Sequence, residues 1–134
     1  MRNKKNDNNE RITKVREVYE EYTVIAPNVC LLDVFRDVTI DLSSQFGEEI
    51  AASANGSKRL LILNFPPEVR FDSGGSATLV DFINKNRGIK VVISGNYERV
   101  QRLMGYAKLD RQPSYRETDR EALKEYFTEF TTPV

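Results

Sequence analysis

The sequence predicts an α/β domain built on a mixed, largely parallel sheet of about five strands covered by about four helices. The apolar run Leu60–Leu63 is uninterrupted and is bounded by polar and turn-forming residues, and Ile89–Ile93 is a second short run, rich in β-branched residues, that contains one lysine. Such runs are typical of strands that are buried on both faces. Segments whose apolar residues recur at helical spacing lie before, between and after these runs. Strands that alternate with helices favour crossover connections and parallel pairing.

The length of 134 residues indicates one domain. Residues 1–20 are expected to form a flexible or partly helical N-terminal arm, and residues 21–134 the domain itself. The polar, Asn-rich start predicts disorder over residues 1–10. Within residues 11–21 the apolar spacing fits a helix, whereas the β-branched and aromatic residues favour a strand. We favour a short helix or an irregular arm there.

The remaining elements follow from local signals. The expected order is a strand at 22–26, a strand at 29–35, a helix from about Asp41 to Ala54, a strand at 60–63, a helix at about 75–86, a strand at 89–93, a helix capped by Asn96, an edge strand at 113–116 and a last helix. Pro27-Asn28 predicts a turn, so the first two strands are expected to form a hairpin. Pro113 restricts its strand to a sheet edge. Thr118 and Glu121 form a capping box that opens the last helix.

The composition excludes several classes of function. Twenty basic residues balance twenty acidic ones, so the overall charge gives no attraction to nucleic acid. The chain has no histidine, which removes His-based zinc sites and Ser-His-Asp triads, and its one cysteine, Cys30, lies in an apolar run typical of a buried residue. No apolar segment approaches the ~20 residues of a membrane helix. We therefore expect a cytoplasmic protein that is not an enzyme, with no catalytic residues, metal, cofactor or membrane insertion.

The segment Asp72-Ser73-Gly74-Gly75-Ser76 is the main candidate site. Small polar residues at the start of a helix leave its first N–H groups free for an anion, or for a phosphate carried by a serine. The plainer interpretation is a turn with a helix N-cap. The glycine spacing does not match a dinucleotide-binding loop. The carboxylate pair Glu48-Glu49 is interpreted as a solvated helix face, because adjacent helical residues do not face each other.

In combination, these features resemble a STAS domain, the fold of bacterial anti-sigma factor antagonists. The resemblance spans roughly Val24 to Phe127 and rests on four segments in order: Leu60-Leu61-Ile62-Leu63-Asn64, Phe71-Asp72-Ser73-Gly74-Gly75, the strand-like Gly88–Gly95, and Val100–Leu109. The second segment is similar to the Asp-Ser-Ser/Thr-Gly signature of that family. The ordered spacing of the four segments carries the resemblance, because none is specific alone.

The resemblance implies a regulatory module that binds a protein partner, such as an anti-sigma factor with a serine kinase fold. In the family, the loop and helix around the signature dock the partner, and phosphorylation of the third signature residue releases it, since a phosphate brings about −1.5 to −2 charges into the docked surface. Here that third position is Gly74, which has no hydroxyl. Ser73 is therefore the candidate substitute phosphoacceptor, and Ser76 is the other nearby serine.

Three functions follow from the sequence. The first is a non-enzymatic, partner-switching module in bacterial signal transduction and transcription regulation, present as a monomer or weak dimer. The second, also implied by the resemblance, is a STAS accessory subunit of a transport or stress-signalling assembly. The third is a small-ligand or nucleotide-binding domain that uses the helix start at Gly74-Gly75.

Overall fold

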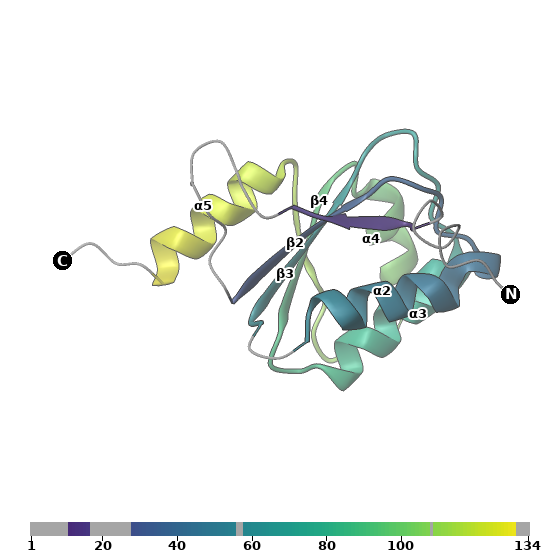
Figure 1. Cartoon of the computed structure of the whole chain (residues 1–134), viewed down its shortest axis with the longest axis horizontal. Coiled ribbons are helices and arrows are strands. Elements are labelled where there is room, and N and C mark those ends of the chain that lie inside the picture. Colours follow the sequence, from purple (N-terminus) through teal and green to yellow (C-terminus); the bar gives the residue numbers. More distant parts are fainter. Residues whose placement is uncertain (1–10, 17–27, 56–57, 108, 131–134) are drawn as a thin grey trace, which may run out of the picture.

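The computed structural model describes residues 11–16, 28–55, 58–107 and 109–130, which form a five-stranded sheet packed between helices (Figure 1). The strands are β1 (Thr13–Val15), β2 (Val29–Val34), β3 (Leu60–Phe65), β4 (Lys90–Gly95) and β5 (Ser114–Arg116). The helices are the short 3-10 turn η1 (Ile40–Leu42), α2 (Ser43–Ser53), α3 (Ser73–Lys85), α4 (Glu98–Met104) and α5 (Asp119–Phe130). The sheet order follows the sequence, from β1 to β5.

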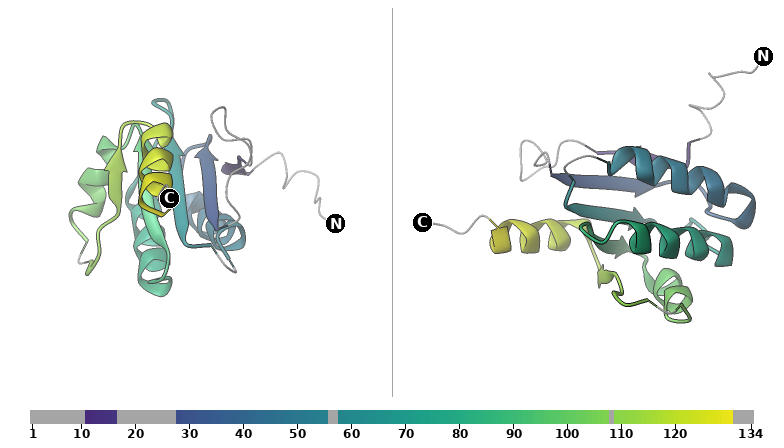
Figure 2. Two further views of the ribbon diagram at one scale, coloured as in Figure 1. Left: turned by 90° about the vertical axis from the view of Figure 1, so that its left-hand side faces the viewer. Right: turned by 90° about the horizontal axis from the view of Figure 1, so that it is seen from below.

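The sheet is mixed because its first strand runs against the others. β1 pairs with β2 in antiparallel fashion, whereas β2, β3, β4 and β5 pair in parallel. Each parallel pair is joined through one helix, and every crossover moves one strand along the sheet in the same direction. Because these crossovers share one handedness, α2, α3 and α4 lie on the same face of the sheet. α5 follows the last strand and covers the other face (Figure 2).

Two apolar clusters separate these layers. The larger one joins the inner face of the sheet to α2, α3 and α4, and it contains the fully buried Phe46, Leu61, Leu79 and Ile93. The smaller one joins Leu31 and Ile62 of the opposite face to Leu123 of α5. The strands β2, β3 and β4 are therefore covered on both sides, which explains why their sequences are mostly apolar rather than alternating.

The predicted architecture is confirmed in the order of the elements from β2 onward and in the central strand pair. Leu60–Phe65 and Lys90–Gly95 are adjacent parallel strands, with Leu61 opposite Val91. Leu61 is fully buried and Val92 is 5% exposed. β5 lies at the edge of the sheet, as the proline before it predicts. The expected strand at 22–26 and its hairpin lie outside the described residues.

The prediction of a helical or irregular arm is wrong for residues 13–15. Thr13–Val15 is a strand of the sheet, and Thr13 lies opposite Val34 of β2. The helical spacing of the surrounding apolar residues is therefore misleading at this point. Backbone pairing with β2 decides the conformation, and the β-branched residues that sequence reasoning set aside are the ones that pair.

Two predicted helix caps have different outcomes. The cap of α4 is wrong at Asn96, because Tyr97 occupies the N-cap position without a side-chain hydrogen bond. The backbone N–H of Asn96 instead donates to the carbonyl oxygen of Phe65 at 2.7 Å. The start of α5 is confirmed, since Thr118 Oγ1 accepts from the N–H of Glu121 at 3.1 Å.

Candidate functional site

The start of α3 is the centre of the candidate site, and two segments distant in sequence meet there. Val38 and Phe71 form an isolated parallel bridge, in which the N–H of Val38 donates to Arg70 O at 2.8 Å and the N–H of Asp72 to Val38 O at 3.1 Å. This bridge places η1 directly against the first turn of α3. The segment 72–76 and the turn η1 therefore form one surface, which we call the α3-start surface and define by Ile40, Asp72, Ser73, Gly74 and Gly75.

Asp72 is the N-cap of α3, and its carboxylate already accepts three backbone hydrogen bonds. Oδ1 accepts from the N–H groups of Gly74 at 2.9 Å and Gly75 at 3.3 Å, and Oδ2 accepts from the N–H of Ile40 at 3.1 Å. A carboxylate at a helix start complements the helix dipole. The N–H groups of Gly74 and Gly75, which were expected to be free for an anion, therefore already donate to Asp72. The negative charge of this carboxylate also repels a bound anion.

Gly74 allows η1 to approach α3 closely. A Cβ atom added at Gly74 would lie 2.5 Å from the Cα of Ile40, a distance that real Cβ contacts do not reach. Gly75 is similarly enclosed, because its added Cβ would lie 2.8 Å from Val38 Cγ1. The glycine at the signature position is thus required by the packing of η1, and the backbone of Ile40 fills the space that a hydroxyl-bearing side chain would need.

The two serines of this segment have different environments. Ser73 is exposed in the first turn of α3. Ser76 is 8% exposed, and its Oγ lies 3.6 Å from Met104 Sδ in the interior between α3 and α4. Of the two serines, only Ser73 has a hydroxyl within reach of another protein.

Ile40 is the apolar residue that this arrangement presents to solvent. It is 67% exposed although the backbone on either side of it is held by hydrogen bonds. On the outer side of the bridge, Asp37 accepts from the backbone N–H and the guanidinium of Arg70. The Arg70 N–H holds the pKa of this exposed carboxyl below its ordinary value. These contacts keep η1 in one position.

Sequence reasoning missed the role of Glu49, which it assigned to a solvated face together with Glu48. Glu48 is exposed, but Glu49 is 8% exposed and binds the N-terminal strand. Its Oε1 accepts from the N–H of Thr13 at 2.8 Å and from Thr13 Oγ1 at 2.6 Å, and both oxygens accept from the N–H of Ile12 at 3.1 Å. Burial alone would raise the pKa of Glu49, but the hydrogen bonds from Thr13, Gln45 and Ile12 hold it below its ordinary value.

A second polar cluster links β1 to the opposite face of the sheet. The guanidinium of Arg16 binds Asp33 of β2 and lies 2.8 Å from Asp119 of α5. The hydrogen bond with Asp33 raises the pKa of Arg16. Asn64 donates to Asp33 at 3.3 Å and accepts from Ser94 Oγ at 3.0 Å. No sequence pattern marks this cluster, because its members come from five separate segments.

The described part of the chain gives little support for a reactive cysteine or a metal site. Cys30 is 3% exposed, and burial raises the pKa of its thiol to about 11, so little thiolate forms near neutral pH. Among residues 11–16, 28–55, 58–107 and 109–130, no three His, Cys, Asp or Glu side chains gather as metal ligands would. The helices of these same ranges include none with the length and apolar character needed to cross a membrane.

Two solved structures resemble this one closely. The STAS domain of a SulP transporter from Vibrio cholerae superposes with a TM-score of 0.61 and 25% sequence identity, covering 84% of this chain and 91% of that domain. The anti-sigma factor antagonist SpoIIAA in its unphosphorylated form superposes with a TM-score of 0.59 and 11% identity, covering 85% of this chain and 96% of that protein. No protein-family model and no curated protein matches the sequence.

These likenesses define the class of the molecule as an α/β domain with a mostly parallel sheet and four helices. The chain has the STAS fold, as the resemblance of its sequence implies. The proteins that share this fold here include a transporter domain and an anti-sigma factor antagonist.

Proposed function

We propose that this chain is a non-enzymatic regulatory module that docks a protein partner through the α3-start surface. The observation that carries this proposal is the fixed exposure of Ile40. An apolar side chain that is 67% exposed on a hydrogen-bonded turn needs no ordering when it binds, so little conformational entropy is lost on docking. The role is that of a partner-binding module of the anti-sigma-antagonist type, with an anti-sigma factor of serine kinase fold as the expected partner.

The occupied helix start argues against the nucleotide-binding alternative. Asp72 takes the N–H groups of Gly74 and Gly75, and its negative charge stands where a phosphate would bind. The strands also follow one another in sequence order across the sheet. An open α/β sheet binds its ligand at a point where the strand order reverses, and a sequential order has no such point.

Replacing Ile40 with aspartate is expected to weaken partner capture while leaving the fold intact. The side chain is mostly outside the core, so its replacement removes docking area and places a charge in the interface. Affinity for the captured partner should fall at least about tenfold, equivalent to about 1.4 kcal/mol. Tagged wild-type and variant chains are used to capture partners from an extract of the native host, and the dissociation constant of the purified complex is then measured.

Tyr106→Asp is the matched control for this experiment. Tyr106 is 80% exposed in the turn after α4 and is not one of the residues that define the α3-start surface. Its replacement should leave capture unchanged. Equal loss of capture by both variants, or by neither, would contradict docking through the α3-start surface.

Ser73 is expected to be the only serine in the segment 72–76 that a cognate kinase can modify. It is exposed, whereas Ser76 is buried against Met104. A phosphate on Ser73 would add charge beside the Asp72 carboxylate, so Ser73→Asp should weaken partner binding more than Ser73→Ala does. Mass spectrometry after incubation with the kinase and ATP locates the phosphate. Modification of Ser76 instead would show that α3 and α4 separate in solution.

A second candidate function is an accessory domain of a transport assembly. The identity of 25% with the SulP transporter domain, over 84% of this chain, favours it. Both candidates use a protein partner, and the captured partner distinguishes them. Recovery of transporter subunits supports the second function, and recovery of an anti-sigma factor supports the first.

A further inference from the structure

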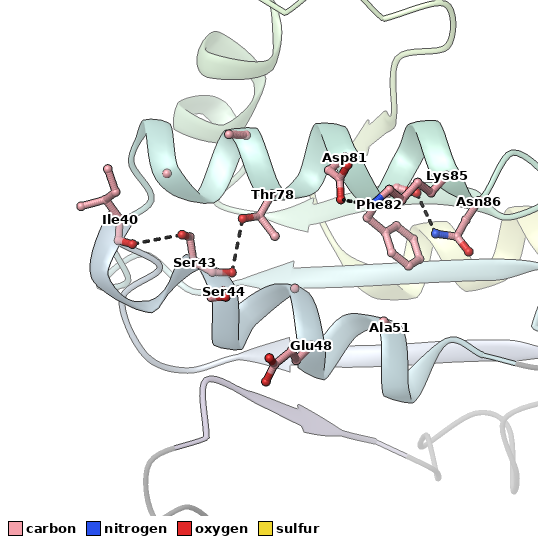
Figure 3. Close-up of a pocket in the computed structure, with 13 residues that line it drawn as sticks. Ile40, Ser43, Ser44, Glu48, Ala51, Thr78, Asp81, Phe82, Lys85 and Asn86 are labelled. Carbon is pink, nitrogen blue, oxygen red and sulfur yellow. Dashed lines mark hydrogen bonds and ion pairs between the residues drawn. The ribbon is translucent and has the colours of Figure 1, made fainter.

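The groove between α2 and α3 begins at the α3-start surface, with which it shares Ile40 and Gly74, and the rest of its lining lies outside that surface. It encloses about 650 Å³ and is lined by residues of η1, α2 and α3 (Figure 3). It starts at Ile40 and Gly74 and ends near Asn86 at the carboxyl end of α3. At the helical rise of about 1.5 Å per residue, that stretch of α3 spans about 18 Å, or roughly three helical turns.

Small side chains keep the groove open. Gly47 and Ala51 line it from α2, and Gly74 and Ala77 line it from α3. The two helices touch at its floor, where Thr78 Oγ1 lies 3.3 Å from the carbonyl oxygen of Ser43 and an added Cβ at Gly47 would lie 2.8 Å from Thr78 Cγ2. Beyond this contact, the side chains of α2 and α3 leave the groove of about 650 Å³ between the two helices.

The walls of the groove determine which backbone can bind there. Both walls are α-helices, whose interior N–H and C=O groups are already paired within each helix. An extended segment would find no partners for its own backbone groups. A helix satisfies its backbone internally and needs only side-chain contacts, so it is the form of chain that suits this groove.

The charges that line the groove determine which charged residues are favoured on the flanks of that helix. Among the residues that line it, Glu48 and Asp81 are acidic and Lys85 is basic, which leaves a net charge of −1. Lys85 Nζ lies 3.2 Å from an oxygen of Asp81, so the lysine is paired within α3. Asp41, next to Ile40 in the chain, is also exposed and adds an acid at the open end. An anionic ligand finds no available cation here.

We propose that the α2–α3 groove binds an amphipathic helix of the partner, one that carries small apolar residues on one face and Lys or Arg on its flanks. This inference rests on the proposed function, because the groove is continuous with the surface that presents Ile40. The apolar face of the helix lies over Ala51 and Ala77, and its basic flanks face Glu48 in the groove and Asp41 at its open end. The acidity is local, since the whole chain has a formal net charge of zero.

Panning a display library against the purified full-length chain tests the proposal. The library presents two-helix hairpins in which one face and both flanks of one helix are randomised, so that the probe is already helical. Enriched sequences are expected to carry Lys or Arg beside small apolar residues. Their binding should fall at least about tenfold, or about 1.4 kcal/mol, for Ala51→Arg, because a long basic side chain fills and neutralises the groove.

Ala52→Arg is the matched control, because Ala52 is an exposed alanine of the same helix that does not line the groove. It should bind the enriched hairpins as the wild type does. The proposal is overturned if no hairpin is enriched, if the enriched flanks are acidic, or if Ala51→Arg and Ala52→Arg bind equally. If the hairpin experiment fails but capture of the partner still depends on Ile40, the groove proposal alone is rejected. If capture does not depend on Ile40, the proposed function is rejected.

Discussion

Replacing Glu49 with alanine is expected to lower the free energy of unfolding by roughly 2–4 kcal/mol, because it leaves buried donors without an acceptor. The N–H groups of Ile12 and Thr13 and the hydroxyl of Thr13 all donate to this carboxylate. Thr13 and Ile12 are fully buried, so water does not replace the lost acceptor in the folded state. Urea unfolding at neutral pH measures the change.

The same carboxylate should make stability depend on pH. Its pKa is lower in the folded chain than in the unfolded one, so it contributes fully above the unfolded value of about 4.3 and loses that contribution as the pH falls through the folded value. The stability of the wild type should therefore fall on acidification through this range. Glu49→Gln should show a shallower fall, because its amide does not titrate.

Glu48→Ala is the control for both measurements. Glu48 precedes Glu49 in α2 but is exposed, so its replacement should change the unfolding free energy by no more than about 0.5 kcal/mol. Amide hydrogen exchange at Ile12 and Thr13 locates the effect at β1. Equal stability of Glu48→Ala and Glu49→Ala would contradict the role of the buried carboxylate in holding β1 on the sheet.

The sequence predicts most of the fold because the central strands carry a local signal. Leu60–Leu63 and Val91–Ile93 are buried on both faces, so these apolar runs can be recognised without any knowledge of their neighbours. Thr13–Val15 carries no such signal. Three residues are too few to show a period of two, and this strand exists because β2 supplies hydrogen bonds and Glu49 supplies an acceptor.

Only the locally determined part of the candidate site is predicted from the sequence. The N-cap at Asp72 follows from residue types over a short span, and the structure places it there. The closure of η1 over Gly74 depends on contacts between segments more than 30 residues apart, such as the bond between Ile40 and Asp72. In the sequence, Gly74 indicates only that the signature position lacks a hydroxyl. The structure shows that Gly74 allows the backbones of η1 and α3 to approach each other closely.

Replacing Gly74 with serine is expected to displace η1 and to lower the free energy of unfolding by about 1–3 kcal/mol, as overpacking usually does. The new Cβ would meet the Cα of Ile40 at 2.5 Å and its N at 3.0 Å, and these are backbone atoms that cannot rotate away. Moving η1 also breaks the hydrogen bond from the N–H of Ile40 to Asp72 Oδ2. Urea unfolding and hydrogen exchange at Ile40 measure the two effects.

Gly88→Ser is the matched control, because a Cβ atom added at Gly88 meets nothing within 4 Å. Gly74→Ser should be less stable than Gly88→Ser, and that difference reports the contact of the new side chain with η1. Gly74→Ser should also weaken partner binding, since Ile40 no longer keeps its position. A hydroxyl restored at the signature position would therefore displace Ile40, the docking residue whose binding its phosphorylation would regulate. A Gly74→Ser chain that is as stable as Gly88→Ser and is phosphorylated at the new serine would show that η1 does not rest on Gly74 in solution.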